Sequence, residues 1–126
     1  MALYAQTSGD LSTNSSSFTA MQGLTLTLPE GVGTTALVIL NVPMPYATGD
    51  HNPGGTFGIT INGTASAVVA GFIYNEQVPP STGRVPTTLV VGVPLANNAQ
   101  TIQAVWQSVR GSTVIIDTPA TLSVTF

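Results

Sequence analysis

Hydrophobic residues alternate with small or polar residues along most of the chain. Leucines alternate with threonines over 24–28, and Phe57, Ile59 and Ile61 are each separated by one small or polar residue. A period of two is the repeat of a half-buried β-strand. Similar runs, rich in Val, Ile and Thr, predict further strands over 34–42, 65–74, 86–95, 100–109, 112–117 and 120–126. No segment has the pattern of a helix.

Turn-forming residues separate these runs. The sharpest signal is Asn62-Gly63, because both residues tolerate the positive φ angles of a type I′ turn. It predicts a hairpin between 57–61 and 65–70. The stretch 8–17 is polar and rich in Ser and Thr, which predicts a long loop. Eight or nine short strands at this spacing predict an all-β fold, an antiparallel jelly-roll sandwich.

Length and charge limit the possible functions. At 126 residues the chain fits a single domain, 1–126. Charged residues make up only 6%, with two arginines, no lysine and a net charge of −3. Much of the surface must therefore be neutral or buried against copies of itself. Two cations are too few for nucleic-acid binding. No apolar run is long enough for membrane insertion, and no basic amphipathic stretch fits a membrane surface.

The N-terminal residues lack the basic and apolar regions of a secretory signal. Either the protein stays inside the cell or, as we expect, it is exported or displayed at the cell surface by a route without a conventional signal peptide.

The two arginines are the first candidates for a binding site. Arg84 follows Ser81 and Thr82, and Arg110 lies in Ser-Val-Arg-Gly-Ser at 108–112. Guanidinium groups form planar, forked hydrogen bonds to oxygen-rich ligands. With hydroxyls nearby and tyrosine rings at 46 and 74, this chemistry suits a neutral sugar. The alternative is that each arginine holds a loop by donating to backbone carbonyls or a carboxylate.

Catalysis and metal binding have little support. His51 is the only histidine, and it lies in a polar turn where solvation explains it. We therefore predict no enzymatic activity and no catalytic residue. The five carboxylates are dispersed, whereas calcium loops concentrate oxygen ligands. Asp50 with Asn52 is the only hint of a metal site, and a turn-capping role explains that pair better. No metal or other cofactor is expected.

Several longer motifs occur in order along the chain. They are Val-Ile-Leu-Asn-Val-Pro at 38–43, Pro-Tyr-Ala-Thr-Gly at 45–49, Val-Pro at 78–79 with Ser-Thr-Gly-Arg at 81–84, and Trp106 with 108–112 and Ile-Asp at 116–117. Together they resemble the fucose-binding N-terminal domain family of the Burkholderia superlectin. The resemblance covers residues 36 to the C-terminus most strongly. It implies a tumour-necrosis-factor-like jelly roll, assembly as a homotrimer, and fucosylated oligosaccharides as partners, held between protomers without metal.

The resemblance also implies site residues. One protomer would supply Tyr46, Ser81, Thr82 and Arg84, and its neighbour Tyr74 and Arg110. The family pattern has a tyrosine where this chain has Thr56 and a threonine where it has Ile73, so these two positions, with Asp117, are peripheral candidates. The rival hypothesis from another class is a structural trimeric jelly roll, such as a fibre knob or capsid-like protein, without sugar binding.

Overall fold

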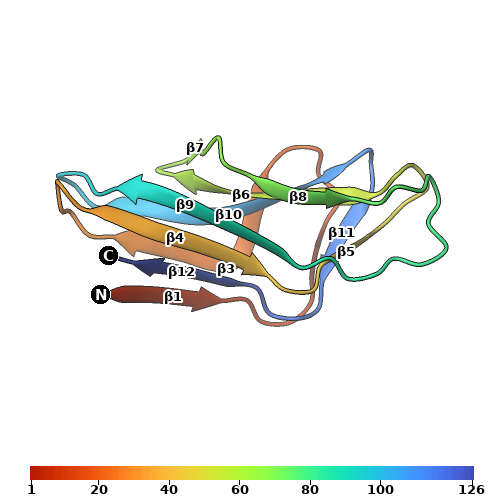
Figure 1. Cartoon of the computed structure of the whole chain (residues 1–126), viewed down its shortest axis with the longest axis horizontal. Helices are drawn as coiled ribbons and strands as arrows, with labels where there is room; N and C mark the ends of the chain where they lie inside the picture. The colour runs from red at the N-terminus through yellow and green to blue at the C-terminus, as the bar shows by residue number, and fades with distance from the viewer.

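A computed structural model describes all residues, 1–126, as an all-β protein without helices. Twelve strands form antiparallel sheets (Figure 1). They are β1 (Ala2–Gln6), β2 (Leu11–Thr13), β3 (Thr19–Leu28), β4 (Thr35–Val42), β5 (Tyr46–Thr48), β6 (Gly54–Ile61), β7 (Thr64–Ala65), β8 (Ala70–Ile73), β9 (Thr87–Pro94), β10 (Gln100–Val109), β11 (Thr113–Ile116) and β12 (Thr121–Thr125).

The strands are arranged as a β-sandwich with a small third sheet. One layer is the four-stranded sheet β1-β12-β4-β9. The other has the order β3-β10-β6-β7, with β8 also paired to β6. The sheet β2-β11-β5 lies toward one end, and both termini lie toward the opposite end (Figure 1). The fold thus places β5, β11 and their adjoining loops far from the chain termini.

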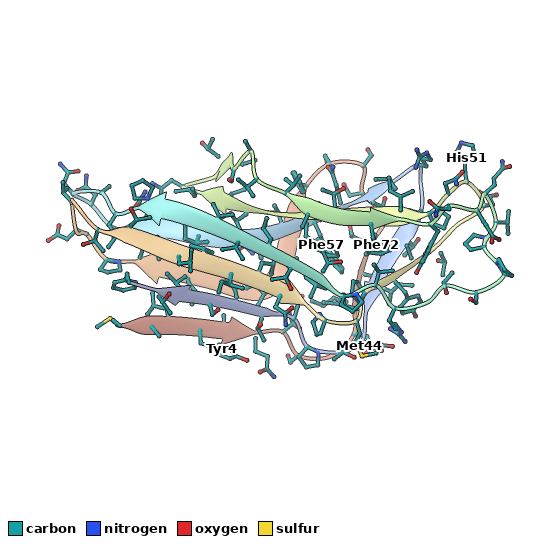
Figure 2. The ribbon with its side chains drawn as sticks, viewed as in Figure 1. Tyr4, Met44, His51, Phe57 and Phe72 are labelled. Carbon is teal, nitrogen blue, oxygen red and sulfur yellow. The ribbon has the colours of Figure 1, made fainter.

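The core fills the space between the two layers. Strands β4 and β9 alternate buried and more exposed positions, as the period of two predicts. Phe57 packs against Phe72 and Trp106, with ring centroids 6.4 and 6.3 Å apart, and Figure 2 shows the two phenylalanines in the middle of the sandwich. Trp106 is 3% exposed, so its predicted place in the core is confirmed.

Most predicted strands and the predicted hairpin are confirmed. Asn62 and Gly63 have φ angles of 51° and 83°, and the pairs Thr60–Ala65 and Ile61–Thr64 flank them. This is the expected type I′ turn. The predicted continuous strand over 65–74 is wrong, because it is interrupted between β7 and β8 while both segments pair with β6.

The prediction of a long loop over 8–17 is also wrong. Residues Leu11–Thr13 form β2 and pair with β11, and the Ser15 carbonyl accepts a hydrogen bond from the Ser108 backbone N–H at 2.9 Å. The polar composition does not predict this strand, because β2 is stabilised by the backbone hydrogen bonds that it forms with β11. Two more strands were not predicted, β1, which pairs with β12, and β5, which pairs with β11, so the chain has twelve strands rather than eight or nine.

None of the strands carries a charged residue or the histidine; all of these lie in the connecting segments. The sheet faces and edges are therefore electrically neutral. No helix long and apolar enough to span a membrane is present.

Candidate functional site

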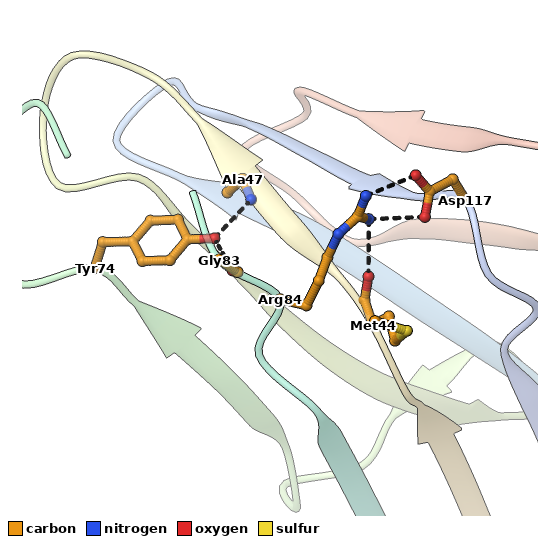
Figure 3. A network of polar contacts seen from close by, with 6 residues as sticks. All are labelled: Met44, Ala47, Tyr74, Gly83, Arg84 and Asp117. Atoms are coloured by element: carbon orange, nitrogen blue, oxygen red, sulfur yellow. Dashed lines mark hydrogen bonds and ion pairs between the residues drawn. The ribbon is translucent and has the colours of Figure 1, made fainter. Parts of the chain in front are cut away.

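The loop between β8 and β9 carries most of the predicted site residues and is held at two places. Tyr74 begins the loop, and its hydroxyl donates to the Gly83 carbonyl at 2.6 Å. The Ala47 N–H approaches the same hydroxyl at 3.4 Å. The Val85 N–H donates to the Pro45 carbonyl at 2.9 Å. These bonds fix the backbone on both sides of Arg84, and Figure 3 shows the two that involve the Tyr74 hydroxyl.

Arg84 forms a forked ion pair with Asp117 (Figure 3). Its Nη1 and Nη2 atoms donate to the two carboxylate oxygens at 2.7 and 2.8 Å, and Nη1 also donates to the Met44 carbonyl at 3.2 Å. The two side chains are 35% and 36% exposed, so the pair lies at the surface. Hydrogen bonding to the guanidinium lowers the pKa of Asp117, and the same bonds raise the pKa of Arg84. Both groups are charged at neutral pH.

Tyr46 supports the guanidinium from one side. It begins β5, and the Arg84 Cζ atom lies 4.1 Å from the centroid of its ring. Such a cation–π contact orients the guanidinium plane. Tyr46, Asp117 and Met44 together hold Arg84 in a defined geometry.

Ser81 and Thr82 lie in the same loop, just before the fixed segment. Ser81 is exposed and Thr82 is half-buried. The hydrogen bonds that hold the loop involve Tyr74, Gly83, Arg84 and Val85, and none uses the hydroxyl of Ser81 or Thr82. Both hydroxyls are therefore free to bond with a ligand.

Arg110 belongs to a second cluster. With Gly111 it forms the two-residue turn between β10 and β11, where the φ angles are 52° and 68°. Its Nη1 approaches the Asn52 carbonyl at 3.4 Å, and Asn52 Nδ2 donates to the Tyr74 carbonyl at 3.2 Å. Tyr74 thus connects the two clusters, through its carbonyl to the Arg110 side and through its hydroxyl to the Arg84 side.

The peripheral candidates Thr56 and Ile73 line a cavity of about 340 Å³ on the β6–β8 pair. Ile73 is 52% exposed and directly precedes Tyr74. The lining residues are Gly55, Thr56, Val69, Gly71, Phe72 and Ile73. Thr56 and Ile73 therefore share one depression next to Tyr74. Asp117, the third peripheral candidate, is not part of this depression and contacts Arg84 instead.

Sequence reasoning underestimated Asp117 and did not identify Met44. It treated Asp117 as peripheral, whereas the structure makes it the direct partner of Arg84 across 33 positions of sequence. Met44 contributes through its backbone carbonyl, which no side-chain pattern reveals. The alternative interpretation of the arginines also has support, because both donate to groups within the chain.

The remaining polar candidates do not gather into a metal site. The exposed His51 ring contacts Gln77 Nε2 through Nδ1 at 3.3 Å. Asn52, which has a φ angle of 48°, serves the turn through its backbone N–H and side-chain amide. No group of three or more His, Cys, Asp or Glu side chains is positioned to hold a metal ion.

Comparison with known proteins assigns the chain to a family. The family described as the Bc2l-C N-terminal domain matches residues 4–125, nearly the whole length. No curated protein matches the chain. The family match agrees with the motifs at 38–49, 78–84 and 106–117, and it covers both clusters described above. The chain is therefore a member of the Bc2l-C N-terminal domain family, a family of carbohydrate-binding lectins without enzymatic activity.

Proposed function

We propose that this protein is a lectin for fucosylated glycans, acting as a homotrimer with its binding sites between protomers and without metal. The observation that carries the proposal is the arrangement around Arg84, where a fixed guanidinium lies over the Tyr46 ring and the preceding residues of the same loop, Ser81 and Thr82, have free hydroxyls. One protomer supplies these four residues and the next supplies Tyr74 and Arg110.

The chemistry of this arrangement fits a neutral sugar. A sugar ring offers hydroxyls that accept hydrogen bonds and C–H groups that pack on an aromatic ring. The guanidinium and the two side-chain hydroxyls supply donors, and the hydroxyls also accept. Fucose has a methyl group in addition, which favours contact with apolar or aromatic surface.

The neutral face of the sheet β1-β12-β4-β9 supports self-association. On its outer side the strand register brings Tyr4, Ser123, Ile39 and Val90 into one row across the four strands. Tyr4 and Val90 are 61% and 50% exposed, as is the neighbouring Leu37 at 44%. An uncharged, partly apolar sheet face is typical of a surface between protomers.

A structural trimer without sugar binding is the second candidate. Its support is that Asp117 and Met44 engage Arg84 within the chain, as in a loop that only needs to be held. The two candidates differ in what they predict for the hydroxyls of Ser81 and Thr82. Only the lectin needs them.

A glycan array with the purified protein separates the two candidates. The proposal predicts signals confined to fucosylated glycans, unchanged by EDTA, because a neutral sugar held by side-chain donors needs no ion. A blank array favours the structural trimer. Binding that disappears with EDTA and returns with calcium contradicts the site, and would direct attention to Asp50 and Asn52.

A further inference from the structure

Arg84 has five N–H groups, and the contacts within the chain use three of them. Nη1 donates to Asp117 and to the Met44 carbonyl, so both of its hydrogens are engaged. Nη2 donates once, to the second oxygen of Asp117. The unused donors are the Nε–H and the second N–H of Nη2, which point in parallel from one side edge of the guanidinium.

This free edge is a fork with a defined shape. Tyr46 covers one face of the guanidinium plane, and Asp117 closes its end, so a ligand approaches within the plane from the side of Nε. Two parallel donors fit two acceptor oxygens that lie side by side. A pair of vicinal sugar hydroxyls has that geometry, and so does a carboxylate.

Charge decides between these two ligands. Asp117 cancels the charge of Arg84, so the fork belongs to a pair that is neutral overall. The chain as a whole has a net charge of −3. A carboxylate at this edge would meet the negative charge of Asp117 across the same guanidinium, whereas a diol would not.

We propose that Asp117 is a specificity-determining residue: by occupying the end of the Arg84 guanidinium and neutralising it, Asp117 reserves the Nε/Nη2 edge for a neutral vicinal diol and rejects acidic ligands. This inference rests on the proposed lectin function and extends it. It makes Asp117 a positioning residue that acts through Arg84 without touching the sugar.

The test compares the wild type with Asp117→Asn. The amide keeps the shape of the side chain and one acceptor oxygen but removes the charge. Methyl α-L-fucoside is titrated by calorimetry in sodium acetate and in sodium chloride of equal ionic strength. We expect acetate to leave the wild-type Kd unchanged and to weaken binding by Asp117→Asn several-fold, because the small carboxylate then competes for the fork.

Arg84→Lys is the second variant. Lysine keeps the charge and an ion pair with Asp117 but lacks a planar fork, so fucoside affinity should fall by about tenfold or more. Circular dichroism and the unfolding midpoint establish that both variants are folded. A role of Asp117 in stability alone would lower the midpoint without creating sensitivity to acetate.

The possible outcomes separate this inference from the proposed function. If the wild type binds fucoside but acetate acts equally on the wild type and Asp117→Asn, the specificity role is wrong and the lectin function stands. The same conclusion follows if Arg84→Lys keeps full affinity. If the wild type binds no neutral sugar at all, the proposed function fails, and this inference fails with it.

Discussion

Arg110 lies in a backbone conformation that few side chains adopt. Its φ angle of 52° is left-handed, and at the first position of a type I′ turn Asn and Gly are the residues usually found. An arginine there costs roughly 1 kcal/mol relative to glycine. Its guanidinium makes one long contact within the chain, to the Asn52 carbonyl at 3.4 Å. Folding alone therefore does not account for an arginine at this position, which supports the ligand contact that we propose for it.

Replacing Arg110 should separate stability from binding. Arg110→Gly relieves the left-handed strain, so we expect an unfolding midpoint a few degrees higher together with loss of fucoside binding. Arg110→Ala is the matched control, because it removes the same guanidinium but keeps the strain. Scanning calorimetry and a fucoside titration measure the two effects. An Arg110→Gly variant that binds as tightly as the wild type would remove Arg110 from the site.

The pKa of Asp117 determines the lowest pH at which the ion pair between Arg84 and Asp117 persists. Hydrogen bonding to Arg84 lowers the pKa of this carboxyl below its ordinary value of 3.8, so the ion pair forms at neutral pH and persists to lower pH than an unpaired carboxyl would stay charged. It is lost only when the pH falls through the lowered pKa. The other side chains at Arg84 are the tyrosines Tyr46 and Tyr74, neither of which is a carboxylate.

We therefore expect fucoside affinity to stay constant from neutral pH down to the ordinary carboxyl range and, at lower pH where Asp117 becomes protonated, to approach the affinity of Asp117→Asn. Isothermal titration at stepped pH measures this, and circular dichroism at each pH establishes that the protein is folded. Asp117→Asn has no carboxyl at this position, so its affinity should not change over the acid range in which the wild type changes. A decline that begins at a pH well above the carboxyl range, in both proteins alike, would show that a group other than Asp117 controls binding.

At the scale of elements, the loop between β8 and β9 is the least regular part of the site. It has no strand of its own, and its return to β9 depends on Tyr74, which bonds to Gly83, and on the bond from Val85 to Pro45. The aromatic ring of Tyr74 also packs edge-on against Phe72, with centroids 5.6 Å apart. The loop is thus anchored to the core through one side chain.

Tyr74→Phe should loosen this loop without unfolding the sandwich. The ring keeps its contact with Phe72, but the 2.6 Å hydrogen bond to Gly83 is lost. We expect faster amide hydrogen exchange at Val85 and weaker fucoside binding, while exchange in β4 and β10 is unchanged. Unaltered exchange at Val85 would show that the hydroxyl does not hold the loop.

How well the sequence predicts these elements depends on what stabilises them. Strands β4, β9 and β10 bury one face, so their alternation of residues is visible in the sequence. Strand β2 is stabilised by backbone pairing with β11, and its Leu-Ser-Thr composition resembles a loop. The pair of Arg84 and Asp117 is formed by tertiary structure, so only its residue types, and not its geometry, could be predicted.

At the scale of the whole molecule, neutrality is the dominant property. Every charged residue lies outside the strands, and the outer row from Tyr4 to Val90 is uncharged. Exposed strands without charges invite pairing with other chains unless they are covered. Assembly into a closed trimer covers such surface and, in our proposal, completes the binding site.

Mixed trimers test whether the site is shared between protomers. Arg84→Ala and Arg110→Ala subunits should each be inactive alone, since every site would lack one guanidinium. After co-refolding of equal amounts, roughly a quarter of the interfaces should join an intact Arg84 to an intact Arg110 and recover fucoside binding. Mixed trimers that form but stay inactive would place both arginines in a site within one protomer.

We propose, above all, that this chain binds fucose through the site around Arg84. Calorimetric titration of the purified protein with methyl α-L-fucoside, in the presence of EDTA, measures it most directly, with Arg84→Ala as the matched variant. We expect saturable binding with one site per chain for the wild type, and a loss of about tenfold or more for a folded Arg84→Ala. Absence of binding by the wild type, or equal affinity of the two proteins, would contradict it.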